Sequence, residues 1–315
     1  MSDTGSDTSF GTSLFTTTIR GNDDGTYRWE RHAALDHGYS LSARPEAQQW
    51  CEAFSTNTVR FLAPSRAGDH RKVSWAVSGR TTLASLLYPA GVVGEDHNLE
   101  DIRQLFSALG SAKEQCPEYL ELATTAEAPI PPASLIRLLK WFDNEWNVGA
   151  SGSDREIFER IVGRRVFGKI KNAAQSLAGQ FTSGQSATKI HGFFSMGNMV
   201  VESARPDRCE VLSGVDIVQG PPAFDTGTLL GELCEYYFSA LSAGLPYEQY
   251  RELARAYLSG GDISPGIDHA SALIIRIATH LLDYSSFVAP IPEFALYRDL
   301  FLEVIDNPLS WLYDE

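Results

Sequence analysis

The sequence predicts an α+β protein with a small β-rich N-terminal lobe and a larger, mainly helical C-terminal lobe. Residues 13–78 contain short segments rich in Thr, Tyr, Trp, Phe and Val, and turn signals separate them. Beyond residue 78, apolar residues recur at helical spacing, apart from one β-rich interruption between residues 189 and 218. Because strands and helices occur in separate runs, the pattern indicates α+β organisation.

Five segments of the small lobe are strand candidates: SLFTTTI, TYRWERH, YSLSA, TVRFLA and KVSWAV. A short helix is expected in RPEAQQWCEAF, between the third and fourth of them, because Trp50 and Phe54 are four residues apart and a proline lies near its start. We therefore assign residues 13–78 to the small lobe. Residues 1–12 are polar, and we expect them to form a flexible tail.

Residues 79–315 are assigned to the helical lobe. The segment SDREIFERIVGRRVFGKIKNAAQSLAGQF is expected to form one long helix, which Ser153 and Asp154 would cap. Two strands are expected in KIHGFFSMGNMVV and CEVLSGVDIV, in the middle of the lobe. Four further helical segments follow them, from TGTLLGELCEYYFSALSAG to EFALYRDLFLEVID.

The bulk properties exclude several classes of partner. The formal net charge of −14 over 315 residues argues against non-specific nucleic-acid binding, but an acidic surface suits a basic peptide or a cationic small molecule. No apolar run is long enough to span a membrane, and the first residues lack the apolar core of a secretory signal. The four cysteines are scattered, which predicts neither disulfides nor a zinc site. We expect a cytoplasmic protein with no nucleic-acid or membrane partner.

Three motifs in order carry a resemblance to a known family. The segment KIHGFFSMGNMVV contains His191, Phe193 and Asn198, VLSGVDIV contains Asp216, and PPAFDTG contains Asp225. These motifs resemble those of the aminoglycoside phosphotransferase family, relatives of the protein kinases, whose catalytic loop has the form H-G-D-x-x-x-x-N. Upstream, VSWAVSGRTTLASLL looks like the hinge strand, turn and helix of that family.

The resemblance implies a bilobal kinase-like fold and a nucleotide, ATP or GTP, bound with Mg²⁺. It implies that Asn198 and Asp216 are the metal ligands, and both offer the hard oxygen atoms that Mg²⁺ prefers. It implies that Asp225 supports the loop by bonding backbone donors, and that His191 is a hydrogen-bonded scaffold residue rather than an acid or base. The alternative for the ligand pair is that Asn198 caps a turn and Asp216 is a solvated loop acid.

One departure from the family pattern concerns the catalytic base. Phe193 stands where the family has an aspartate, and a phenyl ring can neither accept a proton nor orient a hydroxyl group. General-base help contributes about two to four orders of magnitude in rate, so this departure is consistent with an inactive protein. It is also consistent with an enzyme that uses another base, because phosphoryl transfer has a loose transition state and needs little early proton removal.

A second departure concerns the lysine that clamps the nucleotide phosphates in the family. The first lysine of the chain is Lys72, on the fifth strand candidate, and alignment with the family places Ser42 at the usual position. Arg44, two residues later, could bind phosphate as a bidentate donor. Other cationic candidates in the small lobe are Arg20, Arg28 and Arg31.

A more particular resemblance covers residues 191–235. The runs HGFFSMGNMVV and VLSGVDIVQGPPAFDTGTLLGELCE are similar to the stand-alone kinase-like proteins of class V lanthipeptide biosynthesis. In that family the kinase phosphorylates Ser and Thr hydroxyls of a ribosomally made precursor peptide, and a separate lyase-like partner eliminates the phosphate.

Three functions therefore stay open. The first is a phosphotransferase that acts on a precursor peptide, and the second is a pseudokinase that binds a partner or peptide without catalysis. The third is a small-molecule kinase with an aminoglycoside-like substrate. Loss of the aspartate and the lysine favours the pseudokinase, whereas the presence of Asn198 and Asp216 favours the two enzymes.

Overall fold

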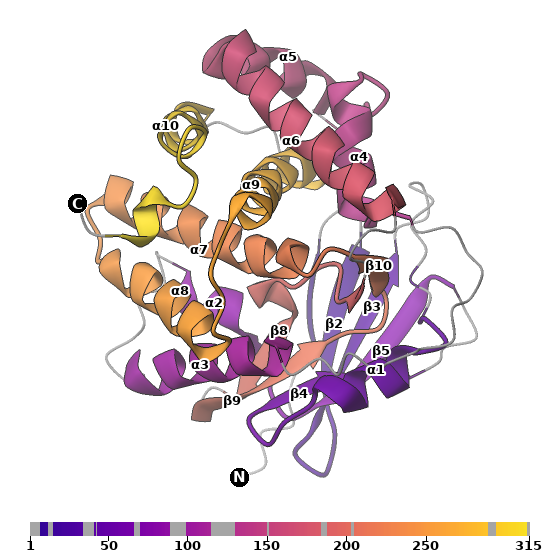
Figure 1. The fold of residues 1–315 in the computed structure, drawn as a ribbon. Coiled ribbons are helices and arrows are strands. Elements are labelled where there is room, and N and C mark those ends of the chain that lie inside the picture. The colour runs from indigo at the N-terminus through magenta and orange to yellow at the C-terminus, as the bar shows by residue number, and fades with distance from the viewer. Residues whose placement is uncertain are drawn as a thin grey trace. The chain divides into compact units, whose positions relative to one another are not determined.

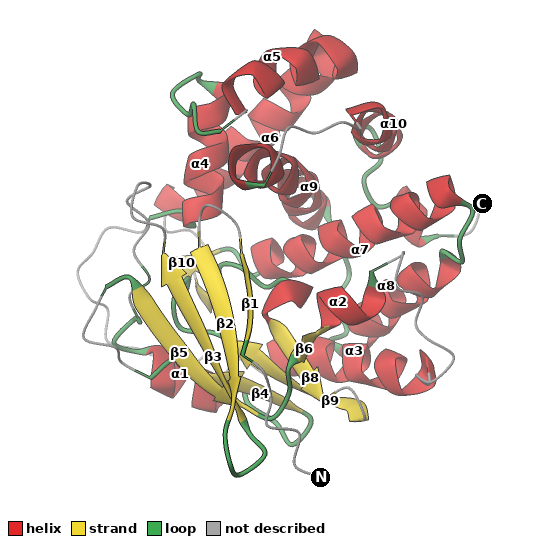
Figure 2. Ribbon diagram, turned by 180° about the vertical axis from the view of Figure 1, so that it is seen from behind, coloured by secondary structure: helices red, strands yellow, loops and turns green. Residues whose placement is uncertain are grey.

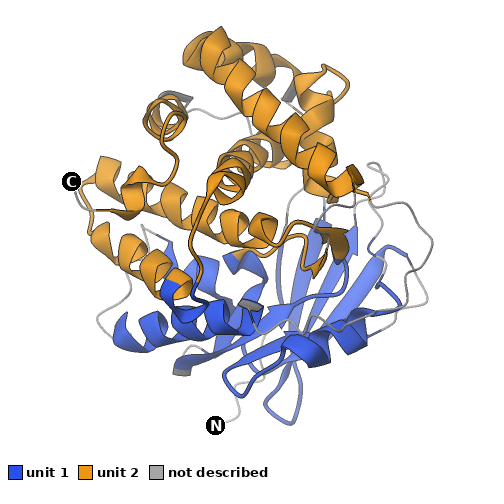
Figure 3. Cartoon of the chain, in the orientation of Figure 1, with its two compact units in different colours: residues 1–125, 196–217, 259–262 blue, residues 126–195, 218–258, 263–315 orange. Residues whose placement is uncertain are grey.

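The computed structural model of the chain describes residues 7–11, 15–33, 41, 43–65, 70–88, 99–114, 130–149, 151–183, 188–202, 205–288 and 294–313. The chain divides into two compact units, coloured blue and orange in Figure 3. Unit 1 comprises residues 1–125, 196–217 and 259–262, and unit 2 comprises residues 126–195, 218–258 and 263–315. Two four-stranded sheets form unit 1 and helices dominate unit 2, which confirms the predicted α+β class.

Unit 1 contains two sheets, with strand orders β1-β2-β3-β5 and β4-β9-β8-β6 (Figures 1 and 2). Its strands are β1 Thr8–Gly11, β2 Phe15–Gly21, β3 Tyr27–Ala33, β4 Val59–Leu62, β5 Lys72–Val77, β6 Thr81–Thr82, β8 Met199–Glu202 and β9 Arg205–Leu212. Its helices are α1 Ala47–Phe54, α2 Leu83–Leu87 and α3 Leu99–Glu114. The first sheet is antiparallel throughout, whereas β4 pairs with β9 in parallel, with Val59 opposite Cys209.

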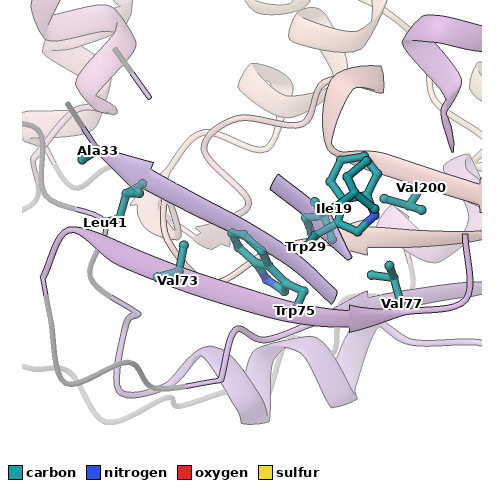
Figure 4. Close-up of a cluster of buried hydrophobic side chains, with 9 residues drawn as sticks. Ile19, Trp29, Ala33, Leu41, Val73, Trp75, Val77 and Val200 are labelled. Atoms are coloured by element: carbon teal, nitrogen blue, oxygen red, sulfur yellow. The ribbon is translucent and has the colours of Figure 1, made fainter. Parts of the chain in front are cut away.

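The core of unit 1 lies on one face of the first sheet and includes residues of the second (Figure 4). In the register of β2, β3 and β5, Ile19 lies opposite Trp29 and Trp29 lies opposite Trp75, so the three side chains share a face. Val200 and Leu212 belong to the same cluster. Both indole N–H groups bond backbone carbonyls: that of Trp29 donates to Gly79 O and that of Trp75 to Ser213 O, each at 3.1 Å. Both large rings are therefore buried with their polar atoms satisfied.

Unit 2 contains the antiparallel pair β7 Thr188–Ile190 and β10 Val218–Gly220 and most of the helices. The helices are α4 Ala133–Phe142, α5 Ser151–Val162, α6 Arg164–Ser183, α7 Ala223–Ala243, α8 Glu248–Gly260, α9 Ile267–Phe287 and α10 Phe294–Val304. Helices α7 and α9 approach closely because two glycines of α7 face α9: a Cβ added to Gly227 would lie 2.4 Å from the Ala272 Cβ, and one on Gly231 2.8 Å from the Arg276 Cβ.

Three sequence expectations need correction. Residues 8–11, expected in the flexible tail, form β1, because their backbone pairs with β2. The single helix expected over residues 153–181 is two helices, because Gly163 has a φ of 82° that ends α5 before α6 begins. The compact units also do not divide at residue 78, because β8 and β9 pair with β6 and β4 of unit 1. The expected strand YSLSA lies largely outside the described residues.

None of the described helices is long and apolar enough to cross a membrane. Cys51, Cys209 and Cys234 are buried free thiols, and burial, the main influence on the Cys51 thiol, raises its pKa to about 12. A thiol with so high a pKa is a weak nucleophile.

Candidate functional site

The predicted catalytic loop begins directly after β7, and Asp225 fixes its first turn. Asp225 lies in the first turn of α7 and is fully buried. Its Oδ2 accepts a hydrogen bond from His191 N at 2.7 Å, and its Oδ1 accepts one from Gly192 N at 3.0 Å. Gly192 has a φ of 79°, a conformation that favours glycine. Because hydrogen bonds to a carboxylate are about twice as strong as neutral ones, Asp225 holds this turn firmly.

His191 also bonds the loop itself. Its side chain is buried, its Nδ1 accepts a hydrogen bond from Phe193 N at 3.2 Å, and its ring packs against Phe194 with centroids 5.8 Å apart. In this arrangement Nδ1 carries no proton, so the neutral ring has its proton on Nε2. Phe193 is partly buried. Its side chain offers no proton acceptor at the position where the family has its base.

Asn198 lies at the other end of the loop, in unit 1. It ends the 3-10 turn η1, Met196–Asn198, directly before β8, and only 2% of it is exposed. Its Oδ1 accepts a hydrogen bond from Nη2 of Arg31 at 2.8 Å. The Arg31 guanidinium lies over two aromatic rings, 5.2 Å from the centroid of Phe15 and 5.5 Å from that of Trp75. The fold thus brings a cation of β3 to an asparagine 167 residues away in the sequence.

No protein-family profile matches the sequence, and no curated protein matches it significantly. Solved structures do share its architecture. Amicoumacin kinase hAmiN, in complex with AMP-PNP, Ca²⁺ and Ami, has a TM-score of 0.56 at 12% identity, with 96% of this chain and 88% of that chain covered. Spectinomycin phosphotransferase APH(9)-Ia, in complex with ADP and spectinomycin, has a TM-score of 0.51 at 7% identity, with coverage of 97% and 93%. The ternary complex of streptomycin, ATP and APH(2")-IIa has a TM-score of 0.50 at 11% identity, with coverage of 95% and 91%.

The chain has the aminoglycoside phosphotransferase-like fold. The fold expected from the three sequence motifs is therefore confirmed. At these identities the likeness establishes the architecture, whereas the chemistry depends on the side chains of this chain.

The resemblance of the loop motif to the aminoglycoside phosphotransferase family implies a divalent cation at Asn198, and the arrangement around this residue does not fit one. The amide oxygen that a metal ion would need already accepts a hydrogen bond from the Arg31 guanidinium. Two like unit charges about 4 Å apart repel by roughly 4 kcal/mol near a protein surface, so a metal ion and this guanidinium would not share the oxygen. Asp216, the second predicted ligand, lies partly exposed in the turn between β9 and β10.

The described residues contain no group of three or more His, Cys, Asp or Glu side chains placed to hold a metal ion. This absence does not test Asn198 and Asp216, because asparagine is not among these residue types. Metal binding by this pair stays a prediction, and the contact between Arg31 and Asn198 argues against it.

Arg20 and Arg28, the other cationic candidates of β2 and β3, lie on the opposite face of the sheet from Arg31. Arg20 and Arg28 are opposite each other in the register of β2 and β3, and both pair with Glu30, at 3.9 Å and 3.2 Å. Since alternate residues of a strand point to opposite faces, Arg28 and Glu30 lie on the face away from Arg31. Burial is the largest influence on Glu30 and would raise its pKa, but the hydrogen bond and charge of Lys72, with Arg20 and Arg28, lower the pKa overall. Strand alternation thus separates Arg31 from the other two named arginines.

Ser42, which aligns with the family lysine, and Arg44, two residues later, have different outcomes. Ser42 lies outside the described residues. Arg44 is described, and its backbone N donates to Gly214 O at 2.8 Å, two residues before Asp216. This contact brings the Arg44 backbone to the turn that carries Asp216. A role of Arg44 in phosphate binding stays a prediction.

Sequence reasoning missed a buried ionic network next to the loop in unit 2. The hydroxyl of Ser195 donates to Glu232 Oε1 at 3.3 Å, and Arg276 of α9 lies 3.4 Å from both Glu232 and Glu235 of α7. Burial, the largest influence, would lower the pKa of Arg276, but the two carboxylates raise it overall. Arg276 therefore stays charged and joins the two helices. The sequence signal was the three-residue spacing of Glu232 and Glu235, which puts both carboxylates on one face of a helix.

Proposed function

We propose that this protein is a nucleotide-dependent phosphotransferase, using ATP or GTP, with an atypical catalytic loop. The observation that carries the proposal is the contact between Arg31 and Asn198, which places a fixed cation at the asparagine of the loop. Phosphoryl transfer asks a protein mainly for positioning and for neutralising charge on the phosphoryl group. A guanidinium held by two aromatic rings supplies positive charge that need not reorganise during the reaction.

The acceptor that we propose is a Ser or Thr hydroxyl of a precursor peptide, with a lyase-like partner protein that later eliminates the phosphate. This part of the proposal is supported by the similarity of residues 191–235 to the kinase-like proteins of class V lanthipeptide biosynthesis. The net charge of −14 also suits a basic peptide.

Phe193 is expected to limit the rate of transfer. With no carboxylate at that position, the acceptor hydroxyl loses its proton without direct help from the loop, which the loose transition state of phosphoryl transfer tolerates. Restoring an aspartate by Phe193→Asp should therefore raise the rate, by up to about 10²-fold. Phe193→Asn is the matched control, because the asparagine side chain resembles that of aspartate in size and polarity but is not a base.

The test is mass spectrometry of the protein with ATP and a Ser/Thr-containing precursor peptide. The proposal predicts a peptide that gains phosphate, faster with F193D than with F193N, and that loses water once the partner lyase is added. A peptide whose mass is unchanged with the wild type, F193D and the partner together would contradict it.

A pseudokinase is the second candidate, and two features of the sequence favour it. Phe193 stands where the family has its base, and Ser42 stands where the family has its lysine. This candidate predicts that the peptide binds without gaining mass in the same experiment. A small-molecule kinase is the third, favoured by the solved relatives in complexes with Ami, spectinomycin and streptomycin. Spectinomycin and streptomycin are therefore included as alternative acceptors.

A further inference from the structure

We propose that Arg31 takes the place of a divalent cation at Asn198, so that unit 1 binds the phosphate groups of a nucleotide without a metal ion. The inference rests on the proposed function, since it concerns how the same nucleotide is held. The amide oxygen of Asn198, which would bind a metal ion, accepts a hydrogen bond from a side chain of the protein itself.

Arg31 is held in place from several sides, so its position at Asn198 is a built feature of unit 1. It lies in the middle of β3, opposite Thr17 of β2 and Val73 of β5. Its guanidinium lies over the rings of Phe15 and Trp75. A cation over aromatic faces is attracted by their electron-rich surfaces, and this restricts where the guanidinium can move.

Asn198 is held equally well. It is 2% exposed and ends the 3-10 turn η1 directly before β8. Val200 and Val201 of β8 pair with β6 and β9. An asparagine amide oxygen in this position can accept from a guanidinium or bind a metal ion, and both partners are cations. The charge delivered to an approaching phosphate is therefore of the same sign in either case.

A guanidinium differs from a metal ion in ways that can be measured. It is always charged at neutral pH and binds phosphate through planar N–H groups, so it needs no dissolved cation. A divalent ion bridges phosphate oxygens only when it is present in solution. Nucleotide binding by this protein should therefore be insensitive to chelators, whereas a metal-dependent site would lose its affinity.

The first experiment measures ATP binding to the full chain by calorimetry, once with excess Mg²⁺ and once with EDTA. We expect the two dissociation constants to agree within about threefold, because Arg31 supplies the local charge in both cases. Arg31→Gln should weaken binding in EDTA by about 10- to 100-fold, the effect of losing one charged hydrogen bond. Arg31→Lys keeps the charge but loses the planar fork of N–H groups. Its dissociation constant for ATP in EDTA should therefore lie between those of the wild type and R31Q.

Arg60→Gln is the matched control. Arg60 is also an arginine of unit 1 that donates to a buried side-chain oxygen, that of Glu210 at 3.0 Å, but it lies on β4. The Arg60→Gln substitution should leave the dissociation constant for ATP unchanged. Thermal unfolding of each variant shows whether the fold is retained. ATP binding that requires Mg²⁺ and is equal in the wild type and R31Q would overturn the inference.

The second experiment uses Mn²⁺ alone, so that its result does not depend on nucleotide binding. We expect no Mn²⁺ binding at Asn198 in the wild type by electron paramagnetic resonance, because Arg31 blocks the amide oxygen. Mn²⁺ binding that Asn198→Ala abolishes would overturn the inference. If ATP binds in neither condition, the proposed function fails, and the Mn²⁺ result alone decides whether Arg31 holds the cation position.

Discussion

The buried backbone N–H groups of His191 and Gly192 both donate hydrogen bonds to the carboxylate of Asp225. Asp225→Ala would leave both donors without an acceptor, and each such loss costs about 1–3 kcal/mol. We therefore expect the free energy of unfolding to fall by about 2–6 kcal/mol, measured from urea denaturation of the full chain. Asp225→Asn keeps one acceptor oxygen and should lose less than Asp225→Ala.

Asp207→Ala is the control for this measurement, because Asp207 is an exposed residue of β9. Its effect should stay within about 0.5 kcal/mol. Equal shifts of the urea midpoint in D225A and D207A would show that the two loop hydrogen bonds contribute nothing to stability.

Single residues of the candidate site differ in how far the sequence could predict them. The resemblance of three motifs to a known family sufficed to name His191, Asn198 and Asp225 as candidates, because each motif is a short stretch of chain. The sequence named Arg31 only as one of several cations, because the contact with Asn198 joins residues far apart in the sequence. A signal existed: Arg31 is two residues from Trp29, so strand alternation puts it on the buried face, whereas Arg20 and Arg28 fall on the other.

At the scale of elements, the break between α5 and α6 offers a test based on two glycines. Apart from the adjoining backbone, neither Gly163, between the helices, nor Gly168, inside α6, has an atom within 4 Å of where a Cβ would be. They differ in backbone conformation, because only Gly163 has a positive φ, of 82°. Gly163→Ala should destabilise the protein by about 1–2 kcal/mol, whereas Gly168→Ala should stabilise it by about 0.5–1 kcal/mol. Chemical denaturation of the two variants checks the opposite signs.

If G163A is as stable as G168A, a left-handed residue at the junction is not needed, and a continuous helix over residues 153–181 would cost no stability. Apolar periodicity runs through Gly163 without interruption, so pattern reading could not detect the break. The parallel pairing of β4 with β9 was equally invisible, because strand propensity does not specify which strand a segment will pair with. Elements were predictable where the signal is local, and pairings were not.

At the scale of the whole molecule, the order of the chain does not follow the compact units. Unit 1 takes its first strands from the N-terminal part, but β8 and β9 come from residues 199–212, after much of unit 2 has passed. The sequence placed the end of the small lobe at residue 78 because strand-like composition stops there. Composition along the chain cannot reveal that a later hairpin completes an earlier sheet.

This organisation predicts that residues 1–125 do not fold alone. Such a fragment keeps β4 and β6 but lacks β9 and β8, their partners in the second sheet, and it also lacks Val200 and Leu212 of the core. Backbone groups of two strands would lose their partners and both tryptophans of the cluster would lose apolar contacts, so we expect no cooperative unfolding transition. Joining residues 196–217 to the fragment through a Gly/Ser linker restores these partners and should restore a cooperative transition, followed by tryptophan fluorescence during urea denaturation. A fragment of residues 1–125 that unfolds as sharply as the joined version would show that the first sheet and its helices suffice, and that the hairpin is added to a unit already folded.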